Sequence, residues 1–324
     1  MAELPLVATM VGDPCGIGPE VCAKALTMDS VWSSGRILLV GSSESVEAAI
    51  RQSVLPLTVH AIRDIAEARF RRGEVDVLDI NPLRAEAITV GRASAPCGRA
   101  VLEWLATVDA LATGGVADAC VIGPVNSDAL MSTGAIASVD DLQPAGTFLL
   151  RVGGKLRIVA ISEHLPLNNV SSSVSLERIL KVLKITDQAL RRWGVSVPRL
   201  VVAGLNPHAH GEEEREEIAP AVAAARKIGI VVTGPVSPDA VFRQCNEGRY
   251  DVVVSMYHDQ GQIALKTVPN VGAWTVYLGA PTVRVTMPHG TAFDIAGKGV
   301  ADPLSMAGAM RAAGRLVSGY GFTD

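Results

Sequence analysis

The sequence predicts an α/β fold built on a largely parallel β-sheet. Short, continuous apolar runs alternate with longer amphipathic stretches along almost the whole chain, a pattern typical of buried strands that are connected by helices. With 324 residues, of which 48% are hydrophobic, the chain is long enough for two packed lobes. No repeat or low-complexity linker separates them, so the lobes need not be contiguous in sequence.

The expected elements follow one another in a regular order. The first apolar run, Leu6–Val11, leads into a glycine- and proline-rich turn over Gly12–Glu20, after which Val21–Met28 continues as a helix. The further expected strands are Arg36–Val40, Ala119–Ile122, Leu156–Ile161, Arg199–Ala203, Ile228–Val232 and Asp251–Met256. The long helices are expected over Gly98–Ala112, Ser175–Trp193 and Glu216–Lys227. In such a sheet, ligands gather at the carboxyl ends of the strands.

Composition and charge exclude several classes of partner. The net charge is −4 and no basic tract or basic-aromatic stripe occurs, which argues against nucleic acid. The chain begins with a predicted strand instead of a signal peptide, and no apolar run reaches the ~20 residues that span a bilayer. The five cysteines form no CxxC pair, which indicates free thiols in a reducing compartment. We therefore expect a cytoplasmic protein with a small-molecule substrate.

The turn at Gly12–Glu20 follows the first strand, where a ligand loop would stand. Gly12, Gly16 and Gly18 permit tight turns and close backbone approach. Pro19 suits a first helical turn, and Glu20 favours the positive end of that helix. The spacing is not that of a GxGxxG fingerprint, so a structural turn and a binding loop both remain open.

Three of the six histidines share one kind of position. His164, His208 and His258 each lie a few residues beyond an expected buried strand, so a sheet could bring them to one edge. Three imidazoles with an open fourth position form a catalytic metal site. The alternative is that each is a polar loop residue. His210 is followed by an acidic run and is expected to support the site or face solvent, and His60 is expected to be structural.

Basic and glycine-flanked residues follow the last of these histidines. Lys266 and Arg284 are candidates for holding an anionic substrate group, the lysine as a point charge and the arginine in a two-pronged pair. The alternative for both is an exposed, solvated side chain. Near the end of the sequence, the segment His289–Gly299 places a His-Gly-Thr turn before an acid, an arrangement that could receive an adenosine group.

Together, these motifs resemble the 4-hydroxythreonine-4-phosphate dehydrogenase family of pyridoxal phosphate biosynthesis. The family is related to the isocitrate and isopropylmalate dehydrogenases and includes a terephthalate cis-dihydrodiol dehydrogenase-like branch. The resemblance runs from about Leu6 to about Ala313. Its carriers are Gly-Asp-Pro-Cys-Gly-Ile-Gly-Pro-Glu at 12–20, Gly-Pro-Val-Asn at 123–126, Glu-His-Leu-Pro-Leu at 163–167, Gly-Leu-Asn-Pro-His at 204–208, Met-Tyr-His-Asp-Gln-Gly at 256–261 and His-Gly-Thr-Ala-Phe-Asp-Ile-Ala-Gly at 289–297.

This resemblance implies two α/β/α lobes around a cleft, interleaved in sequence. We expect residues 1–130 and 285–324 in the first lobe and residues 131–284 in the second. It also implies a homodimer whose active site draws on both subunits.

The resemblance further implies roles for particular residues. The family's metal ligands fall on His164, His208 and His258. Its substrate-binding lysine and arginine fall on Lys266 and Arg284. The segment that receives the adenosine side of NAD or NADP falls on His289, Gly290, Thr291, Ala292 and Asp294.

The sequence departs from the family in the expected substrate wall. The family usually has a histidine directly before a substrate-contacting threonine, but here Thr147 follows Ala145-Gly146 and the histidine is absent under either alignment. Thr275 stands where the family has a substrate-contacting asparagine, and Ser127 where a lysine is common. The identity of the substrate is therefore less determined than the chemistry.

The function predicted from these observations is metal-dependent, NAD(P)-linked oxidation and decarboxylation of a small hydroxy acid. The preferred substrate is 4-phosphohydroxy-L-threonine or a close 4-phosphorylated analogue. The metal would lower the pKa of the substrate hydroxyl, hydride would pass to the nicotinamide, and the resulting β-keto acid would lose carbon dioxide. Asp259 would orient a histidine or relay a proton, with a structural hydrogen bond as the alternative. Imidazole ligands suit zinc, cobalt or nickel better than magnesium.

Three other functions remain open at this point. The first is a cis-dihydrodiol dehydrogenase for an aromatic dicarboxylate such as terephthalate, with equivalent chemistry. The second is a metal-dependent hydrolase or lyase that uses the same three histidines without a nicotinamide. The third is a catalytically silent binding protein that kept the fold.

Overall fold

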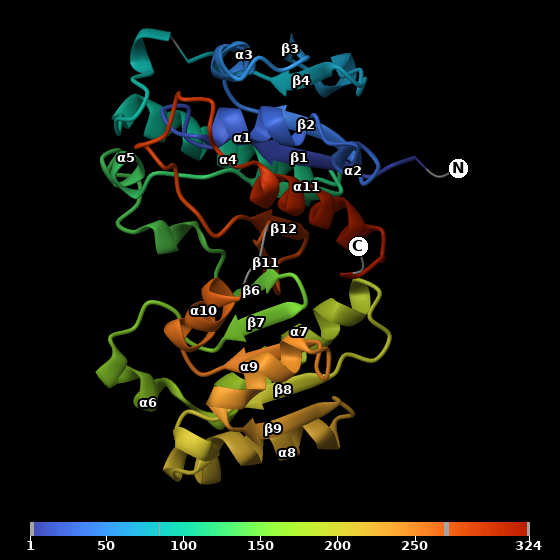
Figure 1. Cartoon of the computed structure of the whole chain (residues 1–324), viewed down its shortest axis with the longest axis vertical. Helices are drawn as coiled ribbons and strands as arrows, with labels where there is room; N and C mark the ends of the chain where they lie inside the picture. The colour runs from blue at the N-terminus through green and yellow to red at the C-terminus, as the bar shows by residue number, and fades with distance from the viewer. Residues whose placement is uncertain (1–2, 84, 269–271, 323–324) are drawn as a thin grey trace. The chain divides into compact units, whose positions relative to one another are not determined.

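The computed structural model describes residues 3–83, 85–268 and 272–322 (Figure 1). The chain divides into two compact units. Unit 1 comprises Met1–Ala145 and Ala280–Ser318, and unit 2 comprises Gly146–Gly279 and Gly319–Thr323. Each unit is an α/β structure, as the alternation of apolar runs and amphipathic stretches predicts. None of the described helices is long and apolar enough to cross a membrane.

Unit 1 is built on parallel strands in the order β3-β4-β2-β1-β5-β12. The strands are β1 (Leu6–Met10), β2 (Arg36–Val40), β3 (Thr58–Ile62), β4 (Glu74–Leu78), β5 (Ala119–Ile122) and β12 (Val283–Thr286). The helices are α1 (Gly18–Ala25), α2 (Asp29–Trp32), α3 (Ser43–Gln52), α4 (Ala95–Thr113), α5 (Ser127–Met131) and α11 (Leu304–Val317). Short 3₁₀ turns lie at Ile65–Glu67, Ala85–Ala87 and Val139–Leu142. Every residue of the central strands β1 and β5 is buried, which explains their continuous apolar sequences.

Unit 2 has the strand order β11-β6-β7-β10-β8-β9. Its strands are β6 (Phe148–Gly153), β7 (Leu156–Ala160), β8 (Leu200–Ala203), β9 (Val232–Val236), β10 (Val252–Ser255) and β11 (Trp274–Leu278). Strand β6 runs antiparallel to both β11 and β7, and the remaining pairs are parallel. The helices are α6 (Val170–Ser173), α7 (Leu176–Arg192), α8 (Ala219–Lys227), α9 (Pro238–Asn246) and α10 (His258–Thr267), with a π-helical turn at Glu214–Ile218 and 3₁₀ turns at Leu167–Asn169 and Pro207–Ala209.

The long helices begin where their sequences supply a cap. The hydroxyl of Ser175 accepts a hydrogen bond from the backbone N–H of Arg178 at the start of α7, and Ser94 does the same for Cys97 at the start of α4. The buried residues of α7 recur at helical spacing, from Ile179 to Leu190, and form one apolar stripe. These caps and stripes explain why the two helices could be predicted within a few residues.

One expected strand was wrong. The run Ile228–Val232 was expected to be a buried strand, but Ile228 and Val231 are 56% and 47% exposed. The chain turns at Gly229, whose φ is +87°, and β9 occupies Val232–Val236 instead. A short apolar run fits a turn next to a strand as well as the strand itself, so composition alone did not locate the boundary.

The observed unit boundaries differ from those expected. The expected boundary after residue 284 falls inside β12. Residues 131–145 belong to unit 1, where the backbone carbonyl of Leu142 accepts a hydrogen bond from Arg284 at 3.2 Å. Residues 319–323 belong to unit 2, where the ring of Phe322 stacks on Trp274 and meets Trp193 edge-on, with centroids 6.0 and 6.1 Å apart. Contacts between residues distant in sequence therefore determine both ends of the division.

Candidate functional site

In unit 1, the glycine-rich loop after β1 contacts the segment expected to receive the cofactor. The backbone N–H of Ile17 donates to the carbonyl of Thr291 at 3.0 Å. A Cβ atom on Gly16 would lie 2.6 Å from the Cβ atom of Thr291, so only glycine permits this approach. The two glycine-rich motifs, which the sequence left as separate features, thus form one continuous structure.

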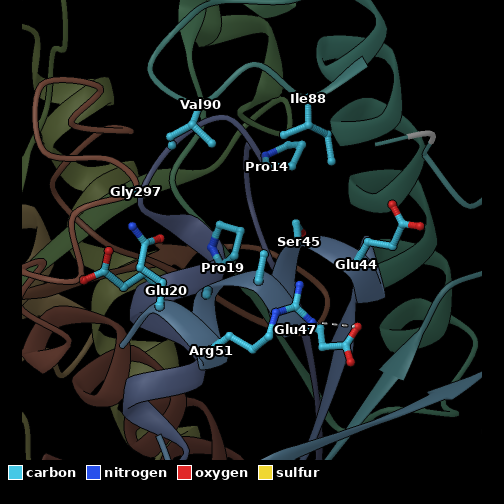
Figure 2. A pocket seen from close by; sticks show the side chains of 14 residues that line it. Pro14, Pro19, Glu20, Glu44, Ser45, Glu47, Arg51, Ile88, Val90 and Gly297 are labelled. Atoms are coloured by element: carbon cyan, nitrogen blue, oxygen red, sulfur yellow. Dashed lines mark ion pairs between the residues drawn. The ribbon is translucent and has the colours of Figure 1, made fainter. Parts of the chain in front are cut away.

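A cavity of about 410 Å³ opens beside this loop (Figure 2). Its lining comes from the loop, α1, α3, the segment before α4 and the last expected cofactor motif, and comprises Pro14, Gly16, Pro19, Glu20, Glu44, Ser45, Glu47, Ala48, Ala49, Arg51, Gln52, Ile88, Val90 and Gly297. Figure 2 shows Pro14 and Pro19 near its centre, and the ion pair between Arg51 and Glu47, 3.4 Å long, at one side. The cavity combines apolar walls with a few polar groups, as small-molecule sites do.

Glu20 at this cavity has a structural role. Its carboxylate is buried and accepts hydrogen bonds from Lys24 Nζ and the backbone N–H of Ala301, both at 2.7 Å. Lys24 also donates to the carbonyls of Gly299 and Ala301, each at 2.9 Å. Glu20 and Lys24 therefore connect α1 to Gly299 and Ala301, at the end of the expected cofactor segment, in addition to the interaction expected between Glu20 and the positive end of α1.

The five expected cofactor residues lie together in unit 1. Thr291 is buried, His289 is half-buried with its Nδ1 atom 3.1 Å from the carbonyl of Gly290, and Asp294 is exposed. Ala292 has a φ of +42°, which is unusual for a residue with a side chain and marks a tight turn. Their role in holding a cofactor stays a prediction.

In unit 2, two of the three expected metal ligands lie close together. His164 follows β7 and His258 begins α10 after β10, and these neighbouring parallel strands end at the same edge. The two imidazole centroids are 5.0 Å apart. With Glu163 they form a group whose potential ligand atoms all lie within 4.8 Å of one another. Imidazole and carboxylate are ligands that zinc and similar divalent cations accept, so these side chains fit a metal.

Asp259 lies within hydrogen-bond distance of one of these histidines. Its Oδ1 atom lies 2.7 Å from Nδ1 of His258. A carboxylate on one ring nitrogen orients the imidazole and leaves the other nitrogen for a metal. The Nε2 atom of His258 lies 3.5 Å from the side-chain nitrogen of Gln262, which is too far for a strong hydrogen bond. The orienting role predicted for Asp259 is compatible with this geometry.

Glu163 is a site residue that the sequence analysis did not single out. Its carboxylate forms a two-pronged ion pair with Arg151 of β6, with N–O distances of 3.1 and 2.6 Å. Arg151 is 5% exposed and stands opposite Thr275 of β11. The sequence does indicate Glu163 as a candidate site residue, because it immediately precedes the predicted metal ligand His164. Arg151 had none, since it stands inside an apolar strand.

His208 is not a member of the group formed by Glu163, His164 and His258 among the residues that the structure describes. It is exposed, lies in the 3₁₀ turn Pro207–Ala209 and has a φ of +57°. The buried carboxylate of Glu214 holds this loop by accepting the backbone N–H groups of Leu205 and Asn206 at 2.7 and 2.8 Å. The strand before His208, β8, neighbours β10 in parallel, so the loop leaves the same edge of the sheet. Its role as third ligand stays a prediction.

The expected substrate anchors differ in their surroundings. Arg284 is 6% exposed and forms short hydrogen bonds of 2.6 and 2.5 Å to both carboxylate oxygens of Asp109 on α4. Lys266 is exposed on α10, and Thr275 is buried in β11. Arg284 therefore already has a strong partner, and anchoring of a substrate by either basic residue stays a prediction.

Thr147 lies at a second cavity, of about 530 Å³, in unit 2. Its lining is polar and comprises Gly146, Thr147, Phe148, Ser172, Ser173, Ser175, Glu177, Arg178 and Lys181. A Cβ atom on Gly146 would meet no atom within 4 Å, so this position, one of the two that could correspond to the histidine of the family, opens toward free space here. Hydroxyl groups with two cations and one acid favour an anionic ligand.

Comparisons with known proteins agree on one family. The model of the family described as "Pyridoxal phosphate biosynthetic protein PdxA" matches residues 33–313. The chain is 39% identical over 98% of its length to a putative 4-hydroxythreonine-4-phosphate dehydrogenase of Novosphingobium aromaticivorans, covering 96% of that protein. It is 35% identical over 94% of its length to a putative D-threonate 4-phosphate dehydrogenase of Halalkalibacterium halodurans, covering 95% of it. The crystal structure of 4-hydroxythreonine-4-phosphate dehydrogenase from Klebsiella pneumoniae superposes with a TM-score of 0.85 at 35% identity, with 97% of this chain and 99% of that chain covered.

Proposed function

We propose that this chain, which belongs to the PdxA family and is an NAD(P)-linked oxidoreductase acting on a CH–OH group, oxidises a 4-phosphorylated hydroxy acid. The preferred substrate is 4-phosphohydroxy-L-threonine or a close analogue such as D-threonate 4-phosphate. Oxidation of the hydroxyl on the carbon β to the carboxylate gives a β-keto acid, so the proposed reaction includes loss of carbon dioxide. The enzyme is proposed to work as a cytoplasmic homodimer.

The observation that carries this proposal is the pair formed by His164 and His258. The centroids of their rings lie 5.0 Å apart, because the two residues follow neighbouring parallel strands, and the carboxylate of Asp259 lies within hydrogen-bond distance of Nδ1 of His258. His164, His258 and His208 are the residues that we propose hold a divalent cation. A cation bound there would lower the pKa of the substrate hydroxyl, while the nicotinamide would accept the hydride.

The remaining residues are proposed to bind and orient. Asp259 is a positioning residue, because it sets the ring orientation of His258 through the hydrogen bond to Nδ1. Arg151 fixes the carboxylate of Glu163 beside the two histidines, so that its charge stays at the cation site. The acid would then raise the affinity for a divalent cation in addition to the imidazoles.

The proposed cofactor site lies in unit 1. We assign the adenosine side of the dinucleotide to the segment His289–Asp294, which packs on the glycine-rich loop beside the cavity of about 410 Å³. Asp294 is exposed and offers an acceptor for ribose hydroxyls. The cavity that Thr147 shares with Arg178 and Lys181 is the proposed subsite for an anionic group of the substrate.

The test is formation of NADH or NADPH with three substrates. Purified protein is incubated with 4-phosphohydroxy-L-threonine, with D-threonate 4-phosphate and with terephthalate cis-dihydrodiol, each with and without a chelator. We expect turnover of a phosphorylated acid that the chelator abolishes and added zinc or cobalt restores. Turnover of the dihydrodiol alone would refute the substrate class, and turnover unaffected by the chelator would refute the metal.

A matched pair of variants tests the proposed ligands. His164→Ala should lose tight stoichiometric metal and turnover together. His210→Ala is the control, because His210 is also an exposed histidine on a loop of unit 2. A His164→Ala protein with unchanged metal content would contradict the assignment. Tight metal with no NAD binding in the unmodified protein would instead favour a hydrolase or lyase.

A further inference from the structure

Two buried cysteines face each other in unit 1. The Sγ atoms of Cys15 and Cys97 are 3.5 Å apart, although the residues are 82 positions apart in sequence. Cys15 stands in the glycine-rich loop, and Cys97 stands in the first turn of α4. Both side chains are fully buried. An S–S bond is about 2.05 Å long, so the sulfurs would need to approach by only about 1.5 Å to form one.

The other three cysteines have different neighbours. The sulfur of Cys22 lies 3.8 Å from the carbonyl of Val11, that of Cys120 lies 3.8 Å from a carboxylate oxygen of Asp109, and that of Cys245 lies 3.5 Å from the carbonyl of Tyr250. Among the described residues, Cys15 and Cys97 are the two whose sulfurs are hydrogen-bonded to each other.

The environment also prepares one of the two sulfurs for reaction. The hydrogen bond from the Cys15 thiol lowers the pKa of Cys97 to about 7, and the same bond raises the pKa of Cys15. Burial raises the pKa of Cys22, of Cys120 to about 12 and of Cys245. The hydrogen bond from Cys15 therefore favours the thiolate on Cys97 over that on Cys15, and the thiolate is the nucleophile in cysteine oxidation.

This pair lies close to the cavity in unit 1. Pro14 and Gly16, on both sides of Cys15, line the cavity of about 410 Å³. Ile88 also lines it, next to Ala87, whose carbonyl oxygen lies 3.3 Å from the sulfur of Cys97. The two buried sulfurs thus lie behind residues that line the cavity.

We propose that Cys15 and Cys97 are an oxidative modification site: a small peroxide oxidises the pair, and a reversible disulfide forms between the two cysteines. The Cys97 thiolate attacks one peroxide oxygen, the O–O bond breaks, and the sulfur becomes a sulfenic acid as one water leaves. The Cys15 sulfur then attacks the Cys97 sulfur, its proton leaves with the hydroxyl as a second water, and the S–S bond forms. Both sulfurs are oxidised and the peroxide is reduced.

The link would act on the cofactor site, a consequence that rests on the proposed function. The loop cannot shift freely toward the cofactor segment, because Gly16 already touches Thr291. Closing the sulfur pair therefore displaces Pro14 and the N-terminus of α4, and so changes the cavity wall. We expect the oxidised protein to bind NAD several-fold more weakly and a thiol reductant to restore the affinity.

The experiment treats the full-length protein with hydrogen peroxide near neutral pH, followed by alkylation, trypsin digestion and mass spectrometry. We expect a loss of two hydrogens and a linked pair of peptides, residues 1–24 and 93–99, that dithiothreitol separates. Cys22 shares the first peptide with Cys15, so Cys22→Ala is the matched control and should still form the link. Cys97→Ser should not.

Each other outcome overturns part of the proposal. A link that is lost in Cys22→Ala, sulfinic or sulfonic acid on Cys97 without a link, or no reaction would refute the modification site. These results come from the unmodified protein and the control, so they hold even if Cys97→Ser fails to fold. A linked protein with unchanged NAD affinity would refute the effect on the cofactor site alone. Absence of NAD binding before oxidation would refute the proposed function and leave the disulfide test intact.

Discussion

Replacing Asp109 with alanine tests whether Arg284 is primarily a structural residue. In the structure, the guanidinium of Arg284 binds both carboxylate oxygens of Asp109 and the carbonyl of Leu142. Asp109→Ala removes the only carboxylate among these partners. The guanidinium then remains in a site where its side chain is 7% exposed, and it has lost the carboxylate of Asp109.

The expected loss of stability follows from the burial of the pair. Removing one partner of a buried ion pair costs about 3–5 kcal/mol. The side chain of Asp109 is 33% exposed, so water can solvate part of the charge left behind. We therefore expect the lower end, a decrease of about 3 kcal/mol in the free energy of unfolding.

Urea denaturation followed by circular dichroism measures this decrease, with an unchanged m-value as the check that the same transition is compared. Glu103→Ala is the control, because Glu103 is an exposed carboxylate on the same helix and should change the free energy by less than about 0.5 kcal/mol. Adding Arg284→Met to Asp109→Ala should recover part of the loss, since the buried guanidinium charge is gone. A loss below about 1 kcal/mol for Asp109→Ala would refute the reasoning.

Three further substitutions test the metal site and the packing around the glycine-rich loop and α4. Asp259→Asn should weaken metal binding about tenfold, the lower end of the range for residues that orient a metal ligand, because the carboxylate beside His258 is 71% exposed. Calorimetric titration with zinc measures the affinity, with the exposed Asp239→Asn as the control, and an equal effect of both substitutions would count against an orienting role. Burial raises the pKa of the Asp13 carboxyl, so the folded state binds the carboxyl proton more tightly than the unfolded state does. The folded state therefore loses stability as the pH rises above the ordinary carboxyl pKa of about 4. Asp13→Asn should be more stable than the unmodified protein at neutral pH and no more stable below about pH 4, and a pH-independent difference in urea denaturation would contradict this. Gly98→Ala should lower the free energy of unfolding by about 3 kcal/mol or more, because the added Cβ would lie 2.2 Å from a backbone carbonyl oxygen of α5. An unchanged free energy of unfolding in urea denaturation would contradict this and show that α4 can move away from α5.

Local signals in the sequence were sufficient for the central strands of both units and for the long helices α4 and α7. The apolar run Leu6–Val11 and the capped stripe Ser175–Trp193 correspond to β1 and α7 within one or two residues. Apolar periodicity depends on side-chain direction within one element, which is a property of adjacent residues. The strand expected at Ile228–Val232 was wrong because a turn at Gly229 can carry the same composition.

The candidate site was predictable where its residues stand in motifs at strand ends. His164 and His258 were identified by their positions after buried strands, and the structure brings their rings together because β7 and β10 are parallel neighbours. Glu163 was missed although it adjoins His164, because the search for ligands was restricted to imidazoles. Its partner Arg151 was missed because an arginine inside an apolar strand carries no local sign of its partner.

By itself, the sequence determined the fold class, about half of the strands and the two loops that carry the family motifs. The tertiary structure alone decided which distant side chains meet: Arg284 with Asp109, 175 residues apart, and Cys15 with Cys97, 82 residues apart. It also decided that residues 319–323 complete unit 2 through Phe322. The physical reason is that helices and strands follow from interactions between near neighbours, whereas strand order and buried pairs depend on how the whole chain packs its apolar faces.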